Sequence, residues 1–211
     1  MIEFKGIKFW RSNHPNSIFF ITRVWLFSLL SITCFIISAA ENSYANDSVV
    51  WNALKSGNHF ALLRHTTAPG IGDPAHFELG KCSTQRNLSK DGINQAVKIG
   101  ERFRANGIDK ARVFSSQWCR CLETAKMLGL GSVEELPVLN SFFQKYEREE
   151  LQTQMLKEWL AKQDLTKPLL LVTHQVNITA LTKVYPDSGE VIIVRQSNPG
   201  EFMVVGRFQM D

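Results

Sequence analysis

The sequence lacks the features that mark nucleic-acid-binding, zinc-binding and repetitive proteins. Its 211 residues include no run of basic side chains and no stripe of alternating basic and aromatic residues, and the formal charge is only +4. These absences argue against a nucleic-acid partner. No histidines and cysteines stand at zinc-ligand spacing, and no internal repeat or low-complexity segment interrupts the chain. With 44% apolar and 21% charged residues, we expect a folded domain with a full core.

The first 45 residues differ in character from the rest of the chain. Basic residues precede an apolar segment from Val24 to Ala40, and small residues at Ser43 and Ala45 occupy the two positions that a signal peptidase reads. This pattern predicts a signal peptide over residues 1–45 and an exported domain over 46–211. The alternative is an uncleaved anchor, because the apolar segment is at the lower limit of the length that spans a membrane.

Cysteine is scarce, and three of the four cysteines fall in the exported part: Cys82, Cys119 and Cys121. In an oxidising compartment two of these three are expected to form a disulfide. Residues two apart near the start of a helix point to nearly opposite faces, which argues against a bond between Cys119 and Cys121. Cys82 is therefore predicted to pair with one of the other two.

The apolar pattern predicts strands that alternate with helices. Helices are expected after residue 47, between Ser89 and Gly107, and over 120–128, 146–162 and 176–182, and Leu151, Met155, Trp159 and Leu160 share one side of the helix over 146–162. Strands are expected over 59–64, 111–116, 133–139, 168–173, 191–195 and 202–208, the last two as a hairpin. This order predicts an α/β protein, a three-layer α/β/α sandwich with a mainly parallel mixed sheet.

The segment from Thr66 to Leu88 shows no helical or strand period. It is rich in proline, glycine and polar residues. We expect a long loop or an irregular lid here, and long loops of this kind usually have a function.

Polar side chains follow three of the predicted strands. Arg64 and His65 end the first, Arg120 comes shortly after the second, and His174 directly follows the fourth. Ligands bind at the carboxyl ends of the strands in such a sheet. Two arginines and two histidines are therefore predicted to meet at one edge.

This combination of side chains suits phosphoryl transfer. The guanidinium groups of Arg64 and Arg120 are permanently charged forks that match phosphate oxygens, and Arg120 falls in the first turn of its helix, where an anion is favoured. A neutral imidazole can attack phosphorus and form a phosphohistidine. Catalysis by charge and position then requires neither a metal nor a cofactor.

Four motifs resemble the histidine phosphatase superfamily, which includes the phosphoglycerate mutases and many acid phosphatases. They read LLRHT from Leu62, LSKDGINQA from Leu88, SSQWCRCLETA from Ser115 and VTHQVNI from Val172. The resemblance implies a phosphoglycerate mutase-like fold. It also implies that His65 is the phosphorylated nucleophile, that Arg64 and Arg120 bind the phosphate, and that His174 completes the pocket and stabilises the transferring group.

The proton donor is the part of the family pattern that this sequence does not show. The phytase-like branch has an aspartate after the second histidine, where this chain has Gln175, and the mutase-like branch has a glutamate where Asn140 and Ser141 stand. The carboxylates that remain as candidates are Asp73, Glu78 and Glu147.

The chain is most similar to the exported bacterial branch that includes lipopolysaccharide core heptose phosphatase-like proteins. We therefore expect a periplasmic phosphomonoesterase that acts on a small-molecule or glycan phosphate, with membrane contact only if the N-terminal segment is uncleaved. Two alternatives are a phosphate-binding module without turnover and a phosphohistidine or phosphoramidate phosphatase, which needs no acid. Candidates for an aromatic surface facing a sugar are Phe77, Trp118, Phe142 and Phe143.

Overall fold

The strands of the protein form one mixed sheet in the order β3-β2-β4-β1-β5-β6. The computed structural model describes residues 48–210, so the predicted signal peptide over 1–45 lies outside the described residues. Four strands run parallel, and two more add an antiparallel hairpin, which confirms the expected mainly parallel mixed sheet. The parallel strands are β1 (His59–Arg64), β2 (Arg112–Ser115), β3 (Val133–Glu135) and β4 (Leu169–Thr173), and the hairpin is β5 (Val191–Asn198) with β6 (Glu201–Phe208).

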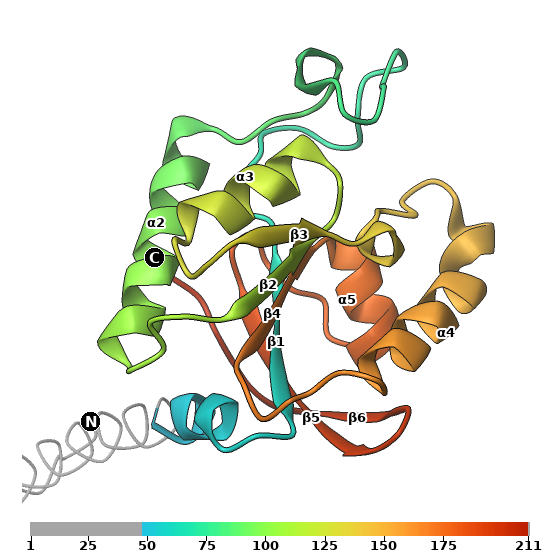
Figure 1. Ribbon diagram of the computed structural model, residues 1–211. Helices are drawn as coiled ribbons and strands as arrows, with labels where there is room; N and C mark the ends of the chain where they lie inside the picture. Colours follow the sequence, from blue (N-terminus) through green and yellow to red (C-terminus); the bar gives the residue numbers. More distant parts are fainter. Residues whose placement is uncertain (1–47, 211) are drawn as a thin grey trace, which may run out of the picture. The chain divides into compact units, whose positions relative to one another are not determined.

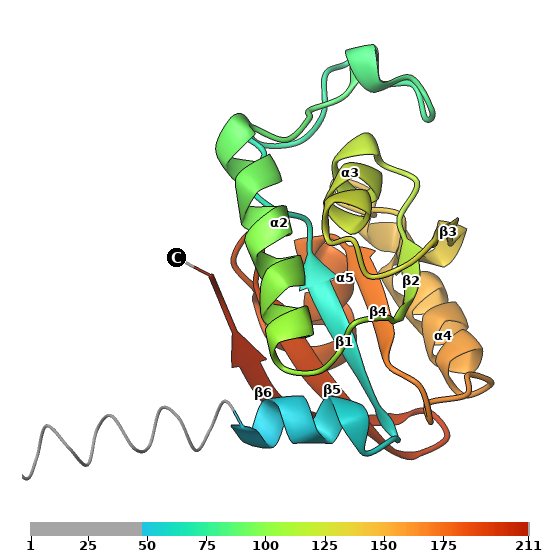
Figure 2. The same ribbon diagram turned by 60° about the vertical axis from the view of Figure 1, so that its left-hand side comes forward.

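Helices cover both faces of this sheet, which makes the three layers expected from the sequence (Figures 1 and 2). One face is covered by α2 (Lys90–Ala105), α3 (Cys119–Met127) and the helix at residues 48–55. The other face is covered by α4 (Glu149–Leu160) and α5 (Gln175–Thr182). Within residues 48–210, no helix combines the length and the apolar character needed to cross a membrane.

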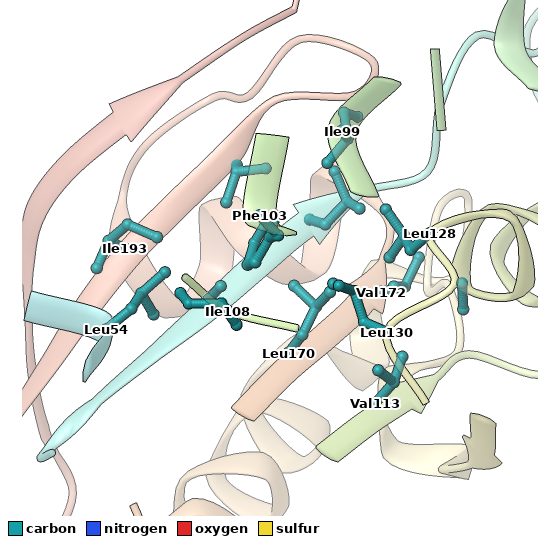
Figure 3. Packing of buried hydrophobic residues seen from close by; sticks show 14 of the residues in the cluster. Leu54, Ile99, Phe103, Ile108, Val113, Leu128, Leu130, Leu170, Val172 and Ile193 are labelled. Atoms are coloured by element: carbon teal, nitrogen blue, oxygen red, sulfur yellow. The ribbon is translucent and has the colours of Figure 1, made fainter. Parts of the chain in front are cut away.

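Two apolar clusters bury the faces of the sheet, because successive side chains of a strand point to opposite sides. In β1, Leu63 packs into the cluster under α2 and α3, and its neighbour Leu62 packs into the cluster under α4 and α5. Figure 3 shows the first cluster, in which Phe103 of α2 lies among side chains from the neighbouring strands. These buried strands fix the positions of the residues that follow them.

The predicted signals at the ends of α2 are confirmed. The Ser89 hydroxyl accepts a hydrogen bond from the backbone N–H of Gly92 at 3.0 Å, as an N-terminal cap does. Gly107 follows the last turn with a φ of +79°, a conformation that glycine adopts without strain.

The prediction for the segment at 133–162 was partly wrong. Pro137 ends the expected third strand early and starts a 3₁₀ turn, η2 (Pro137–Leu139), while a second turn, η3 (Tyr146–Arg148), precedes α4. The expected apolar side of α4 was also only partly correct: Leu160 is buried and Trp159 packs against the core, but Leu151 and Met155 are 69% and 52% exposed. Gln152 and Leu156 are buried together with Leu160.

Gln152 explains this rotation of α4. Its side-chain amide donates to the backbone carbonyl oxygens of Val138 at 3.0 Å and Asn140 at 2.6 Å. Residues 151, 155 and 159 have the same helical spacing as 152, 156 and 160, so periodicity cannot decide between the two stripes. The buried carbonyl groups need a donor, and Gln152 supplies it.

The ends of β1, β2 and β4 meet at one edge of the sheet, because these strands are neighbours and parallel. The loop at residues 66–88 extends beyond this edge, above α2 and α3 in Figures 1 and 2. Its only regular element is a short 3₁₀ turn, η1 (Cys82–Thr84), in agreement with the expected irregular lid.

Replacing Gly100 by alanine should destabilise the fold, even though alanine favours a helix. A Cβ atom at this position of α2 would overlap the backbone carbonyl of Leu128, which follows α3. We expect a loss of about 1–3 kcal/mol in the free energy of unfolding, measured with urea. Lys98→Ala, at an exposed position of the same helix, is the control and should change stability little. Equal stability of the two variants would contradict this account of the contact.

Candidate active site

His65 directly follows β1 and is only 2% exposed. Its Nδ1 lies 2.8 Å from the carbonyl oxygen of Thr66. Because a carbonyl oxygen only accepts, Nδ1 must carry the ring proton in the neutral form, and Nε2 then has the free electron pair. The backbone N–H of His65 donates to Thr173 of the neighbouring strand at 3.0 Å. The strand pairing and the Thr66 carbonyl thus fix both the place and the tautomer of this imidazole.

His174 follows β4 and has the opposite tautomer. Its Nδ1 lies 3.5 Å from Nη2 of Arg120, and its Nε2 lies 2.9 Å from the hydroxyl of Ser116. A guanidinium only donates, so Nδ1 accepts and Nε2–H donates to Ser116. The Ser116 hydroxyl in turn donates a hydrogen bond to Oδ1 of Asn140 at 3.2 Å. The rings of His65 and His174 lie edge to face, with centroids 5.5 Å apart.

Both imidazoles are neutral over the physiological pH range. Burial, and then the charge of Arg120, lower the pKa of His65 from 6.5 to about 3. Burial and Arg120 also lower the pKa of His174 well below its ordinary value. A free electron pair is therefore available on Nε2 of His65 at neutral pH, as a nucleophile requires.

Arg64 and Arg120 flank these histidines and supply the positive charge. Arg120, in the first turn of α3, is only 3% exposed. Arg64 is partly buried, and its Nη1 donates to the carbonyl oxygen of Pro186 at 2.9 Å. In the described part of the chain, the Nε atom of each arginine is buried without a hydrogen-bond partner. An unpaired buried donor costs about 1–3 kcal/mol, so an anion that accepts from these groups would be favoured.

A third arginine, Arg86, joins this group and was missed by the sequence analysis. Its Nε donates to the carbonyl oxygen of Gly72 at 2.8 Å, and its Nη1 donates to the carbonyl oxygen of Ala68. Burial, and then the charge of Arg120, lower the pKa of Arg86 to about 10. Arg86 lies in the long loop and ends no strand, so the rule about strand ends could not find it.

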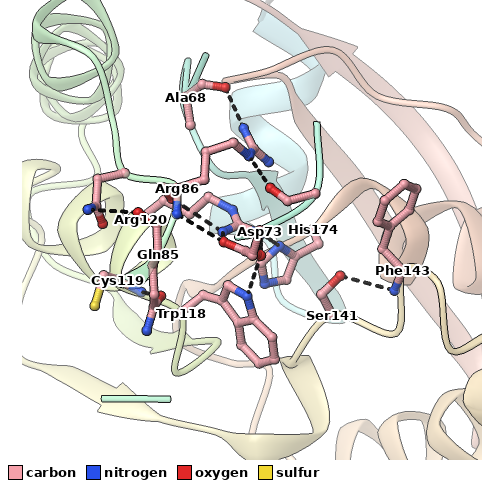
Figure 4. A network of polar contacts seen from close by, with 12 residues as sticks. Ala68, Asp73, Gln85, Arg86, Trp118, Cys119, Arg120, Ser141, Phe143 and His174 are labelled. Atoms are coloured by element: carbon pink, nitrogen blue, oxygen red, sulfur yellow. Dashed lines mark hydrogen bonds and ion pairs between the residues drawn. The ribbon is translucent and has the colours of Figure 1, made fainter. Parts of the chain in front are cut away.

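Asp73 of the long loop forms a two-pronged ion pair with Arg120 (Figure 4). Its carboxylate oxygens lie 2.8 Å from Nη1 and 3.1 Å from Nη2 of Arg120. They also accept from the indole N–H of Trp118 and the backbone N–H of Arg86, each at 3.0 Å. Burial raises the pKa of Asp73, but the hydrogen bond and charge of Arg120 outweigh this effect and hold the pKa below its ordinary value. Asp73 is therefore an ionised carboxylate in this structure.

The other two proton-donor candidates lie at the surface. Glu78 pairs with Lys81 at 3.0 Å, with both side chains more than half exposed. Glu147 is exposed in η3. Of the three candidates, the structure thus brings only Asp73 to the arginines.

Amide and hydroxyl groups occupy the place where the mutase-like branch has its acid. Asn140 accepts from Ser116 and from the backbone N–H of Gln117, and its own amide donates to the Gln117 side chain at 2.9 Å. The hydroxyl of Ser141 accepts from the backbone N–H of Phe143 at 3.2 Å. This region holds the second histidine in place, and its carboxylate, the exposed Glu135 at the end of β3, accepts from the Gln117 side chain at 3.1 Å.

The disulfide joins Cys82 to Cys119, which decides between the two pairings left open by the sequence. It attaches the long loop to the start of α3, directly beside Arg120. Cys121 stays a free, buried thiol whose sulfur lies 3.4 Å from Nε2 of His174. Burial raises the pKa of this thiol to about 12, so it is not a thiolate nucleophile.

A family model matches the part of the chain that contains most of this site. The model of the histidine phosphatase superfamily (branch 1) matches residues 62–142, a range that contains His65, Arg86 and Arg120. Over this range the chain is similar to the histidine phosphatase superfamily. This similarity supports a phosphatase activity. Across residues 48–210, no three histidine, cysteine, aspartate or glutamate side chains form a cluster that could hold a metal ion.

Solved structures of phosphatases share the fold. The protein histidine phosphatase SixA, solved with tungstate, has a TM-score of 0.53 at 15% identity over 72% of this chain and 96% of its own. A phosphoserine phosphatase from Entamoeba histolytica, solved with 3-phosphoglyceric acid, has a TM-score of 0.52 at 16% identity over 72% of this chain and 98% of its own. Identities this low establish the fold alone. No curated protein matches the sequence.

The two neutral histidines should make the folded protein less stable in acid. The unfolded chain binds a proton on each ring near pH 6.5, whereas the folded chain does not, because burial and Arg120 lower both pKa values. The stability present above pH 6.5 is therefore lost as the pH falls, by about 1.4 kcal/mol per pH unit for each ring. Urea unfolding at pH 7 and pH 5 measures this loss.

His65→Asn should remove about half of the histidine contribution to this slope. His76→Asn, at an exposed position of the long loop, is the control and should keep the full slope. An unchanged slope in His65→Asn would show that His65 is not held neutral in the folded state.

Proposed function

We propose that this chain is an exported phosphomonoesterase that transfers the phosphoryl group of an ester first to His65 and then to water. The observation that carries the proposal is the pair of buried, unpartnered Nε–H groups on Arg64 and Arg120, which flank a histidine whose Nε2 has a free electron pair. A phosphoryl group supplies both the oxygens that these donors lack and the phosphorus that the nucleophile attacks.

The proposed reaction has two halves. In the first, the electron pair of His65 Nε2 attacks phosphorus, the bond from phosphorus to the ester oxygen breaks, and that oxygen leaves with the electron pair. In the second, water attacks phosphorus and the bond to Nε2 breaks, which returns the free imidazole and releases phosphate. Arg64, Arg86 and Arg120 offset the charge of the phosphoryl oxygens in both halves. His174 completes the pocket, because its Nδ1 accepts from Arg120 beside the reacting ring.

Export and an envelope substrate are further parts of this proposal. Export is inferred from the predicted signal peptide over residues 1–45, and a sugar or glycan phosphate from the resemblance to the heptose phosphatase-like branch. Phe77 and Trp118 stack with centroids 4.9 Å apart beside Asp73, which supports an aromatic surface next to the phosphate site. Phe142 is 1% exposed and belongs to the core, so it does not contribute to such a surface.

A phosphoramidate or phosphohistidine substrate is the second candidate. It is favoured by the amide and hydroxyl groups of Asn140 and Ser141 at the place of the mutase-like acid, since the nitrogen of a phosphoramidate leaves more easily than an alkoxide. Rates with matched phosphate esters and phosphoramidates distinguish the two functions. A strong preference for the amidate would favour this candidate.

A binding module without turnover is the third candidate. The Asp73 carboxylate forms an ion pair with the guanidinium of Arg120, and an anion that replaced this carboxylate could bind there without reacting. Such a protein would be stabilised by phosphate, as any specific ligand stabilises the folded state, but would not hydrolyse esters. Phosphate-dependent melting together with turnover assays identifies this case.

His65→Ala should abolish hydrolysis of p-nitrophenyl phosphate. The reason is the loss of the nucleophile, and we expect a fall in kcat of at least about 10³-fold. A metal chelator should leave the activity of the wild-type protein unchanged. His76→Ala is the matched control and should keep normal turnover. Full activity in His65→Ala would overturn the nucleophile assignment.

Arg64→Gln should weaken the binding of inorganic phosphate and tungstate. The substitution removes a charged donor group beside His65, so we expect the Kd to rise at least about tenfold in titration calorimetry. Arg148→Gln, which removes an exposed arginine just before α4, should leave the Kd unchanged. Equal affinities for the two variants would place the anion elsewhere.

A further inference from the structure

Asp73 occupies the fork of Arg120 in the way that a phosphate would. Carboxylate and phosphate both present two oxygens to the paired N–H groups of a guanidinium, and Asp73 uses Nη1 and Nη2 together. A phosphoryl group that accepts from the free Nε–H of Arg120 and from the adjacent Nη2 must therefore replace Asp73 on Nη2. The free protein already contains a competing anion at its proposed phosphate site.

The long loop is built so that its tip can move while its base stays in place. The base is held by the Cys82–Cys119 disulfide and by the side chain of Gln85, which accepts from the backbone N–H of Cys119 at 2.9 Å. The tip contains Gly70 and Gly72 in left-handed conformations, with φ of +90° and +70°. The residue between them, Ile71, is 92% exposed and packs little against the rest of the protein. Rotation at the two glycines would break the hydrogen bond from Arg86 to the Gly72 carbonyl and move Asp73 without loss of the disulfide.

Leaving Arg120 changes the protonation of Asp73. In the free protein, Arg120 outweighs the effect of burial and keeps the carboxyl group ionised. When a phosphoryl anion takes the donors of Arg120, the effect of burial persists and the new neighbour is negative, and both raise the pKa of the carboxyl group. Trp118 and the backbone of Arg86 are the other groups that donate to this carboxylate. The displaced carboxyl group can then take a proton from solvent and hold it beside the reacting phosphoryl group.

We propose that Asp73 exchanges with the substrate's phosphoryl group on Arg120 and then acts as the general acid of the reaction. This inference rests on the proposed phosphatase function. As the bond from phosphorus to the ester oxygen breaks, the carboxylic acid of Asp73 gives its proton to that oxygen, and an alcohol leaves. In the second half, the Asp73 carboxylate takes a proton from the attacking water, which restores the acid while phosphate forms.

Other carboxylates near the site are less suited to this role. Glu78 is held by Lys81 at the surface, and Glu147 is exposed in η3. Asp187 is close enough to Arg64 to raise its pKa, but it is exposed, and the structure shows no pairing of its carboxylate with a site arginine among the described residues. Asp187 therefore provides a matched control, because it is an acidic residue near Arg64 that does not form an ion pair with Arg120.

The test compares Asp73→Asn and Asp187→Asn with two substrates that differ in their leaving groups. Nitrophenolate leaves without protonation, whereas the alkoxide of glycerol 2-phosphate needs an acid. Asp73→Asn should raise the ratio of kcat/KM on p-nitrophenyl phosphate to kcat/KM on glycerol 2-phosphate by about 10²–10⁴-fold, because this ratio depends only on the first half of the reaction. Asp73→Glu should restore part of the lost rate, and Asp187→Asn should behave as the wild type with both substrates.

Binding of inorganic phosphate tests the exchange separately, without any turnover. Asp73→Asn removes the competing anion, so its Kd for phosphate in calorimetry should fall at least about tenfold below that of the wild type. An unchanged or weaker affinity would overturn the exchange.

The remaining outcomes bear on the acid and on the proposed function in different ways. An equal change in kcat/KM of Asp73→Asn on both substrates, or a normal kcat/KM on glycerol 2-phosphate, would overturn the acid role. If Asp187→Asn instead lost activity on glycerol 2-phosphate and kept it on p-nitrophenyl phosphate, the acid role would belong to Asp187. A wild-type protein that hydrolyses neither substrate would instead contradict the proposed function, while tighter phosphate binding by Asp73→Asn would still support the exchange.

Discussion

The buried charge of Arg120 is the interaction on which the rest of the site depends. This guanidinium is 3% exposed, and a charge in such a place must be paired with an anion. In the free protein the anion is Asp73, and in the proposed reaction it is the phosphoryl group. The same charge helps to lower the pKa values of His65 and His174, which keeps both rings neutral. One residue thus favours anion binding and preserves a neutral nucleophile.

The long loop and the sheet contribute different properties to this site. The parallel strands β1 and β4 end side by side, and their hydrogen bonds hold the two histidines rigidly. The loop at residues 66–88 has no strand to hold it, and the disulfide at Cys82 ties it to the start of α3 instead. A rigid nucleophile beside an adjustable anion is an arrangement in which substrate can enter without disturbing the core.

Local signals predicted most of the elements correctly because the relevant physics was local. The run before Arg64 is buried on both faces and formed β1 with the expected bounds, and Ser89 caps α2 as its position suggested. The apolar side of α4 was partly wrong because two stripes share one spacing, and a hydrogen bond from Gln152 to the Val138 carbonyl outside the helix favoured one of them. Arg86 was missed because only the folded loop brings it to the site.

The sequence by itself determined the chemistry that is present and the edge of the sheet where it meets. Arg64, His65 and His174 stand at strand ends, and parallel strands place their ends together. The tertiary structure alone decided which nitrogen of each histidine carries the proton, which cysteine pairs with Cys82, and that Asp73 lies on Arg120. These outcomes depend on single hydrogen-bond partners brought together from distant segments, and no local pattern in the sequence encodes such distances.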